Sequence, residues 1–134
     1  MRIDFHINFS GNCREAFLFY RAIFGGDIDL LTYGESQSDI DIPEEWNEKI
    51  IHGSFKLNNL EIAGADVLPE QYKAPQGFHL LLQLKDESES KRIFHALSKG
   101  GSITMPLQPT FWSPYYGIVV DKFGISWEIN CAPA

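Results

Sequence analysis

The sequence predicts an α+β fold made of two βαβββ modules. The main observation is an internal echo: an amphipathic helical segment closed by Gly-Gly occupies residues 12–28 and occurs again at 86–103. A short apolar strand precedes each copy, and strand-like runs follow it. The last run of each copy has an acid between two apolar residues, Glu61 in the first and Glu128 in the second. Duplication of this kind places a shared cleft between the halves.

The chain length favours one domain that contains both modules. With 134 residues and 44% hydrophobic content, the chain can bury one core, whereas each half alone would be marginally stable. We therefore expect a single domain over 1–134. Module one covers about 1–65, a linker with prolines and glycine covers 66–77, and module two covers about 78–134.

Charge and composition exclude several partners. The formal net charge of -7 argues against nucleic acid and anionic membrane surfaces, because binding phosphates requires clustered Lys and Arg. The sequence contains no apolar run of membrane-spanning length and does not begin like a signal peptide, so we expect a cytoplasmic protein. Cys13 and Cys131 lack metal-type spacing, and in a reducing compartment we expect small buried side chains.

Strict alternation predicts the first strand, over residues 3–9. Its apolar residues occupy one face, and Asp4, His6 and Asn8 occupy the other. Each of the two helices that follow begins at a polar residue with Glu three positions later, Asn12 in the first copy and Asp86 in the second, and both starts resemble capping boxes. The expected buried stripes are Cys13, Ala16, Phe17, Tyr20 and Phe24 in the first helix, and Ser90, Ile93, Phe94 and Leu97 in the second.

The remaining strands follow from apolar runs bounded by turn residues. A strand is expected over 27–33, and Asn58-Asn59 joins a hairpin of 49–57 and 60–65. The matching hairpin of module two pairs 115–120 with 125–131. In this arrangement the Glu61 run and the Glu128 run are equivalent final strands.

Parity along the strands gathers polar side chains on the side of the sheet opposite the helices. His79 and Gln83 share that side of the strand over 78–84, as His6 and Asn8 do in module one. Glu61 and Glu128, each between apolar neighbours, point the same way. We expect Asn8 and Gln83 to bind substrate.

Two imidazoles and two carboxylates from four strands form a mixed nitrogen and oxygen shell for a divalent ion such as Zn, Ni, Mn, Co or Fe(II). The predicted ligands are His6, Glu61, His79 and Glu128. Such an ion acts as a Lewis acid on a substrate oxygen while a neighbouring carboxylate moves a proton, the catalytic role expected of Glu128. Spacing alone is a weak signal, because ligands on separate strands make no short motif.

Two further residues are candidates on weaker grounds. His52 shares the parity of Ser54 and Lys56, and three roles stay open for it: metal ligand, general base (the catalytic role expected here) or hydrogen-bonded structural histidine. Trp112 lies in a proline-flanked loop and is expected at the rim of a pocket, where it binds substrate, or in a dimer contact.

Sequence blocks along nearly the whole chain resemble one known family. They read Asn8-Phe9-Ser10-Gly11-Asn12-Cys13-Arg14-Glu15-Ala16-Phe17, Phe19-Tyr20, Phe24-Gly25-Gly26, Lys49-Ile50-Ile51-His52, Met105-Pro106-Leu107, Thr110-Phe111-Trp112, Tyr116-Gly117, Asp121-Lys122-Phe123-Gly124-Ile125-Ser126-Trp127 and Ile129-Asn130-Cys131. In content and order they resemble the PhnB-like branch of the vicinal oxygen chelate superfamily. The resemblance implies paired βαβββ modules that form a cupped mixed sheet with the helices packed outside, the glyoxalase-like fold. It also implies a homodimer and, in many members, a metal at the cup.

The resemblance carries over to the ligand positions unevenly. His79 and Glu128 match the ligand positions of module two, and Glu61 matches through its neighbours. On the first strand an ungapped match places Phe5 at the ligand position, whereas side-chain parity allows Asp4 or His6, and we favour His6.

Three classes of function stay open. The first is a metal-dependent enzyme of the glyoxalase, lyase or dioxygenase kind that acts on a small oxygen-bearing molecule. The second is a non-catalytic protein that sequesters a small molecule, as bleomycin-resistance relatives do. The third is a structural dimerising module. The methyltransferase label that some branch members carry is discounted, because the chain has no glycine-rich turn of the dinucleotide-binding type.

Overall fold

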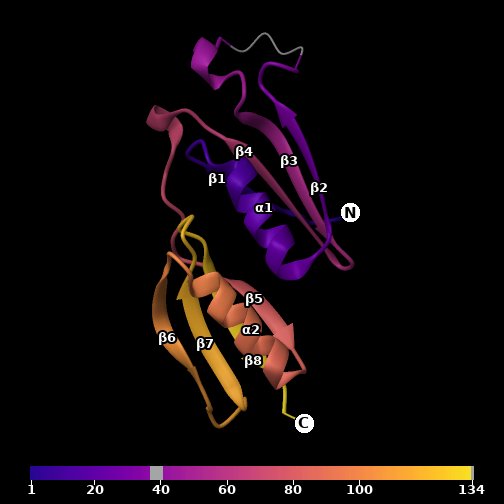
Figure 1. Ribbon diagram of the computed structural model, residues 1–134, viewed down its shortest axis with the longest axis vertical. Coiled ribbons are helices and arrows are strands. Elements are labelled where there is room, and N and C mark those ends of the chain that lie inside the picture. Colours follow the sequence, from indigo (N-terminus) through magenta and orange to yellow (C-terminus); the bar gives the residue numbers. More distant parts are fainter. Residues whose placement is uncertain (37–40, 134) are drawn as a thin grey trace. The chain divides into compact units, whose positions relative to one another are not determined.

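The computed structural model describes residues 1–36 and 41–133 and divides the chain into two compact units, Met1–Lys73 and Ala74–Ala134. In each unit a helix lies across one face of a four-stranded sheet (Figure 1). The predicted α+β class and the two βαβββ modules are therefore confirmed. That the modules share one domain and one cup stays a prediction.

The first unit has a mixed sheet in the order β1-β4-β3-β2. The edge strand β1 runs parallel to β4, and the other neighbours are antiparallel. Its elements are β1 (Phe5–Phe9), α1 (Cys13–Phe24), β2 (Asp27–Thr32), β3 (Ile50–Leu57) and β4 (Leu60–Asp66), with short 3-10 turns η1 (Glu44–Trp46) and η2 (Pro69–Gln71).

The second unit repeats this topology in the order β5-β8-β7-β6, with β5 parallel to β8. Its elements are β5 (Leu80–Leu84), α2 (Glu87–Ser98), β6 (Ser102–Gln108), β7 (Tyr115–Val120) and β8 (Ser126–Cys131). Neither helix of the described chain is long and apolar enough to cross a membrane.

Each core lies between the helix and one face of its sheet. The predicted stripe of α2 is buried throughout, and that of α1 is buried except at its last position. There Ile23 is buried, whereas Phe24 is half-buried and packs its ring 6.4 Å from Phe55. Both cysteines are free thiols in these cores, as expected, and burial raises the pKa of the Cys13 thiol.

The repeated Gly-Gly pair has the same two functions in both units. The first glycine ends the helix in the left-handed region, with φ of 75° at Gly25 and 74° at Gly100. The second lies against the backbone of a neighbouring strand. A Cβ at Gly26 would collide with the Lys56 carbonyl oxygen, and one at Gly101 with that of Val120. The Gly-Gly pair, from which the duplication was inferred, is therefore required by steric contacts in both units.

The start of α1 differs from the predicted capping box. Asn12 is the N-cap residue, but its side chain accepts no capping hydrogen bond. The buried Asp66 carboxylate, from the end of β4, instead accepts from the backbone N–H groups of Gly11 at 3.1 Å and Cys13 at 2.9 Å. In α2 the prediction holds for the cap itself, because Asp86 Oδ1 accepts from the Ser88 N–H at 2.9 Å. A carboxylate distant in sequence thus replaces the local cap in the first unit only.

The edge strands β2 and β6, which lie at the opposite edges of their sheets from β1 and β5, both carry breaks in their pairing register. The break in β2 lies between Leu31 and Thr32. In β6 the register shifts twice, between Ile103 and Met105 and again toward Gln108. Each break falls on a strand whose other side has no partner in its sheet.

Candidate functional site

The predicted site residues other than Trp112 lie on the side of each sheet opposite its helix, here called the open face. The helix side is fixed by Gly64 and Gly117, because a Cβ added at these glycines would meet Phe17 and Phe94 of the helices. Alternation then assigns the remaining side to the open face. In the first unit it carries Asp4, His6, Asn8, His52, Ser54, Lys56, Glu61, Ala63 and Ala65; in the second it carries His79, Leu81, Gln83, Tyr116, Ile118, Ser126, Glu128 and Asn130.

Backbone pairing makes the two open faces comparable position by position. The N–H of Val67 donates to Phe9 O at 2.9 Å, and the N–H of Ala132 donates to Leu84 O at 2.7 Å. Phe9 therefore corresponds to Leu84. Both edge pairs continue in parallel register from there, so residues 61–66 of β4 correspond in order to residues 126–131 of β8.

This register corrects the predicted equivalence of the two glutamates. Glu128 corresponds to Ala63, and Glu61 corresponds to Ser126, a displacement of two residues. Both carboxylates are on their open faces as predicted, because a shift of two preserves the face. By the same register, the counterpart of His79 is Asp4, one of the three alternatives for the first strand.

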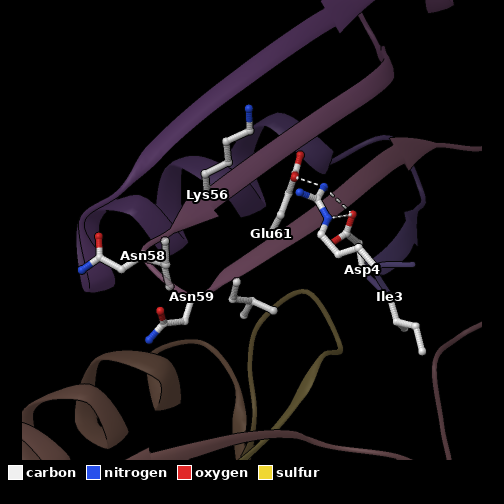
Figure 2. Close-up of a pocket in the computed structure, with 9 residues that line it drawn as sticks. Ile3, Asp4, Lys56, Asn58, Asn59 and Glu61 are labelled. Carbon is white, nitrogen blue, oxygen red and sulfur yellow. Dashed lines mark hydrogen bonds and ion pairs between the residues drawn. The ribbon is translucent and has the colours of Figure 1, made fainter.

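On the first open face, an arginine bridges two carboxylates. The guanidinium of Arg2 lies 2.7 Å from Asp4 and 2.9 Å from Glu61, and the dashed lines in Figure 2 join both acids to this group. The other oxygen of Glu61 accepts from the Ser54 hydroxyl at 2.7 Å. The Asp4 hydrogen bond and charge raise the pKa of Arg2. Both oxygens of the predicted ligand Glu61 are thus engaged.

These acids border a pocket of about 470 Å³ at the turn between β3 and β4. Lys56, Asn58 and Asn59 complete its polar wall (Figure 2). The pocket is open and polar, so its lining favours a hydrated, charged or hydroxylated molecule over an apolar one.

The two histidines of the first open face are separate from this acid pair. His6 Nε2 lies 2.9 Å from Asn8 Oδ1, so a predicted ligand and a predicted substrate-binding residue contact each other on β1. His52 is exposed on β3 and has no hydrogen bond or ion pair among the described residues. Its counterpart in the second unit is Tyr116, because Gly53 and Gly117 pair with corresponding positions.

On the second open face, both predicted ligands are held by hydroxyl groups. His79 Nδ1 lies 2.7 Å from Ser126 Oγ. The Tyr116 hydroxyl donates to Glu128 Oε1 at 2.5 Å. This hydrogen bond, together with burial and the charge of Glu128, raises the pKa of Tyr116 to about 12. The phenol therefore remains a proton donor throughout the neutral range.

An amide pair lies beside the Tyr116–Glu128 pair. Asn130 Nδ2 donates to Gln83 Oε1 at 2.8 Å, whereas the buried Asn130 Oδ1 has no partner within the described chain. Gln83, predicted to bind substrate, therefore belongs to a polar cluster with an acceptor left over. A buried acceptor of this kind requires a hydrogen-bond donor that the described chain does not provide.

Trp112 lies next to this cluster. Its ring packs edge to face against Tyr116 at 5.1 Å and against Phe111 at 4.7 Å. Phe111 is 97% exposed and Trp112 is 46% exposed. The two rings line a shallow pocket of about 390 Å³ with Glu87 and several prolines. An exposed aromatic pair in contact with the Glu128 partner is consistent with the predicted rim role.

The structure brings two of the predicted residues, His6 and Asn8, into contact with each other, and pairs most of the others with residues that the sequence had not indicated. No group of three or more His, Cys, Asp or Glu residues within the described ranges is placed to hold a metal. Sequence reasoning missed Arg2, Ser126, Tyr116 and Asn130 as partners. For Ser126 and Asn130 a signal was present, because both share the parity of Glu128 on one strand.

Two βαβββ units with polar open faces define a protein of the glyoxalase-like class. The sequence model of the family described as 3-demethylubiquinone-9 3-methyltransferase matches residues 2–130. The chain therefore belongs to this family, as the PhnB-like resemblance of its sequence blocks indicated.

Relatives support this assignment. Protein YjdN of Escherichia coli (strain K12) is 31% identical over 139 residues, which cover 97% of this chain and 95% of YjdN. The crystal structure of PA1353 from Pseudomonas aeruginosa matches with a TM-score of 0.90 and 35% identity, covering 98% of both chains. A PhnB protein from Bacillus cereus matches at a TM-score of 0.80 and 28% identity, over 98% of this chain and 100% of that one.

A more distant structure shares the fold alone. It is a glyoxalase/bleomycin resistance protein/dioxygenase family enzyme from Burkholderia phytofirmans PsJN, with a TM-score of 0.66 and 14% identity over 98% of this chain and all of that one. These similarities establish class and family.

Proposed function

We propose that this protein binds a small oxygen-bearing molecule on the open face of its second sheet, with a divalent metal ion held in part by His79 and Glu128. The observation that carries the proposal is the Glu128 carboxylate. It is half-buried on the side opposite α2, and Tyr116 holds one of its oxygens while the other has no partner in the described chain. A half-buried carboxylate with one open oxygen is suited to accept a proton or to ligate an ion.

The donor atoms of the second unit fit half of a metal site. His79 Nε2 and Glu128 Oε2 have no partner among the described residues, and they are the imidazole and carboxylate donors that Zn, Ni, Mn, Co and Fe(II) accept. His79 precedes β5 and Glu128 lies on the adjacent β8, two positions beyond the residue opposite His79, within reach of long side chains. The other two predicted ligands, His6 and Glu61, belong to the first open face, where His6 contacts Asn8 and Glu61 is held by Arg2 and Ser54.

Such an ion, when bound, polarises a substrate oxygen as a Lewis acid. The chain's own groups do the rest. Glu128 accepts a proton at Oε2 when that oxygen does not ligate the ion. The Gln83–Asn130 pair offers amide hydrogen bonds to substrate oxygens, and the Trp112 ring edge shields one side from water. On the first open face, Asn8 binds a substrate oxygen and His52 acts as the general base.

The methyl transfer named in the family description is not part of this proposal. Its chemistry requires a methyl donor site, and the sequence offers no glycine-rich turn for one. The proposal also retains the cytoplasmic location and the homodimer expected from the sequence.

A non-catalytic sequestering protein is the alternative. The exposed Phe111 and Trp112 rings favour it, because an aromatic rim binds planar molecules by stacking without any chemistry. In that case the Glu128 and Asn130 groups provide hydrogen bonds only.

The test is elemental analysis of protein purified without chelator, followed by metal titration of the wild type, His79→Ala and Glu128→Ala. Glu15→Ala, an exposed carboxylate on α1, is the matched control. We expect stoichiometric metal in the wild type and the control, and loss in both site variants. Wild-type protein that neither carries nor takes up a divalent ion would contradict the metal-dependent function, and the sequestering alternative would then lead.

A further inference from the structure

Both predicted ligands of the second open face are already held in place by hydroxyl groups from neighbouring strands. The imidazole of His79 contacts Ser126 Oγ at 2.7 Å, and the carboxylate of Glu128 receives the Tyr116 hydroxyl at 2.5 Å. We propose that Ser126 and Tyr116 are positioning residues, which select the coordinating nitrogen of His79 and the coordinating oxygen of Glu128. This inference rests on the proposed function.

Strand register builds these contacts into the sheet. Leu80 is opposite Trp127 in the parallel β5–β8 pair, so the residue opposite His79 is Ser126. In the β7–β8 pair, Ile118 is opposite Glu128 and Tyr116 is opposite Asn130, which makes Tyr116 a diagonal neighbour of Glu128. Diagonal neighbours on one face are within reach of an aromatic side chain. Both hydroxyls are therefore carried by regular strands instead of mobile loops.

The contacts determine which atoms remain for an ion. When His79 Nδ1 carries the proton it donates to Ser126 Oγ, and the lone pair of Nε2 is left outward. The Tyr116 hydroxyl occupies Glu128 Oε1 and leaves Oε2. Hydrogen-bond partners of this kind fix the tautomer and orientation of metal ligands, and their loss typically reduces metal affinity about 10- to 100-fold.

The first unit lacks both hydroxyl groups at the corresponding positions. Glu61 stands where Ser126 stands, and His52 stands where Tyr116 stands. The counterpart of Glu128 is Ala63, which provides nothing for a hydroxyl to orient. The two hydroxyl contacts are thus a specialisation of the second unit and do not follow from the shared fold.

The first experiment measures the His79 tautomer without metal. Long-range proton–nitrogen NMR spectra of chelator-treated protein at a pH where the imidazole is neutral distinguish Nδ1–H from Nε2–H. We expect the Nδ1–H form in the wild type, a mixture of tautomers in Ser126→Ala, and recovery in Ser126→Thr. An Nε2–H form in the wild type, or no change in Ser126→Ala, overturns the role of Ser126.

The second experiment titrates Zn²⁺ into chelator-treated protein by calorimetry. We expect Kd to rise about 10- to 100-fold in Ser126→Ala and in Tyr116→Phe. The matched controls, which we expect to bind like the wild type, are Ser102→Ala on β6 and Tyr115→Phe, the neighbouring tyrosine on β7.

The outcomes separate this inference from the proposed function. If His79→Ala and Glu128→Ala lose zinc while Ser126→Ala and Tyr116→Phe bind like the wild type, the positioning role is overturned and the proposed function stands. If the wild type binds no zinc or other divalent ion, the metal-dependent function is overturned, and with it the positioning of metal ligands.

Discussion

The two units share a backbone plan but carry different chemistry on their open faces. The second presents Glu128, Tyr116 and an amide pair at positions where the first has Ala63, His52 and other small or polar residues. The first face instead holds its acids at the sheet end, where Arg2 bridges Asp4 and Glu61. The residues common to both copies are mainly those that make the unit fold, whereas the residues that differ on the open faces are those available for function.

The buried aspartates are an exception to this division, because they differ between the units and yet stabilise the fold. In the first unit Asp66 joins the α1 start to β3, because Oδ2 also accepts from the Ile50 N–H at 2.8 Å. The second unit has Cys131 at the corresponding position. It uses Asp121 at the β7–β8 turn, where the carboxylate accepts from the Ile125 N–H at 3.0 Å and the Trp127 indole at 2.9 Å. A buried carboxylate stabilises each unit, at the start of the helix in the first and at the β7–β8 turn in the second.

The largest expected effect tests whether the Gly-Gly pairs are equivalent. Gly26→Ala and Gly101→Ala each force a methyl group into a strand carbonyl, so we expect a loss of about 3 kcal/mol or more in the free energy of unfolding. Gly25→Ala costs the left-handed backbone, about 1–2 kcal/mol, and Gly100→Ala costs the same together with a close contact of 3.3 Å to Lys122 Cβ. Urea denaturation of all four variants checks the ranking. A unit in which the first glycine mattered more than the second would break the equivalence.

Asp66→Ala comes next in size. Three backbone N–H groups lose their charged acceptor, two of them within the buried core, and we expect a loss of about 2–3 kcal/mol. Thermal unfolding followed by circular dichroism measures it. Cys131→Ala, at the corresponding position of the second unit, is the comparison and leaves every backbone donor paired. Equal stability of Asp66→Ala and the wild type would show that the carboxylate is not the cap of α1.

A smaller effect separates the two helix starts. Asp86→Ala removes a true side-chain cap and is expected to cost about 1 kcal/mol. Asn12→Ala removes a side chain that caps nothing and is expected to leave the free energy of unfolding unchanged within error. Chemical denaturation of both variants decides between them. A larger loss for Asn12→Ala than for Asp86→Ala would restore the local capping box to α1.

The smallest effect is a titration. The pKa of Tyr116 is raised to about 12 by its hydrogen bond to Glu128, so Tyr116 keeps its proton in the folded protein until the pH rises through that value. The stabilising effect of the hydrogen bond is present at lower pH and is lost as the pH rises through the same value. In Glu128→Ala we expect the Tyr116 pKa to fall toward the ordinary value of about 10. Carbon NMR of labelled tyrosine in chelator-treated protein follows it, with Tyr116→Phe to assign the signal. An unchanged pKa in Glu128→Ala would mean that Glu128 is not the partner.

Local patterns were sufficient to predict the fold. Alternation found the first strand, apolar runs bounded by turn residues found the others except β6, helical periodicity found both stripes apart from the last position of the first, and Gly-Gly marked both helix ends. The errors arose where a distant residue decides the outcome. The Asn12 cap is replaced by Asp66, which lies 53 positions in sequence beyond Cys13, whose N–H group donates to it. The equivalence of Glu61 and Glu128 is wrong because the matching tripeptides, Leu60-Glu61-Ile62 and Trp127-Glu128-Ile129, lie in different registers against their parallel edge strands, β1 and β5.

For the site, parity correctly predicted which face each candidate occupies, because side-chain alternation is a local property. The partners were beyond reach of the same reasoning. Ser126 meets His79 and Tyr116 meets Glu128 across strand pairs, and such contacts depend on register that no short sequence pattern encodes.

The register breaks in β2 and β6 have a consequence for the behaviour of the protein in concentrated solution. An outer strand with regular, unpaired backbone groups is a template on which another chain can add a strand and begin to aggregate. Both outer strands interrupt that template, and Pro106 removes one hydrogen-bond donor from β6 as well. We expect these two edges to resist strand addition, so that crowding of the protein does not seed fibres from them.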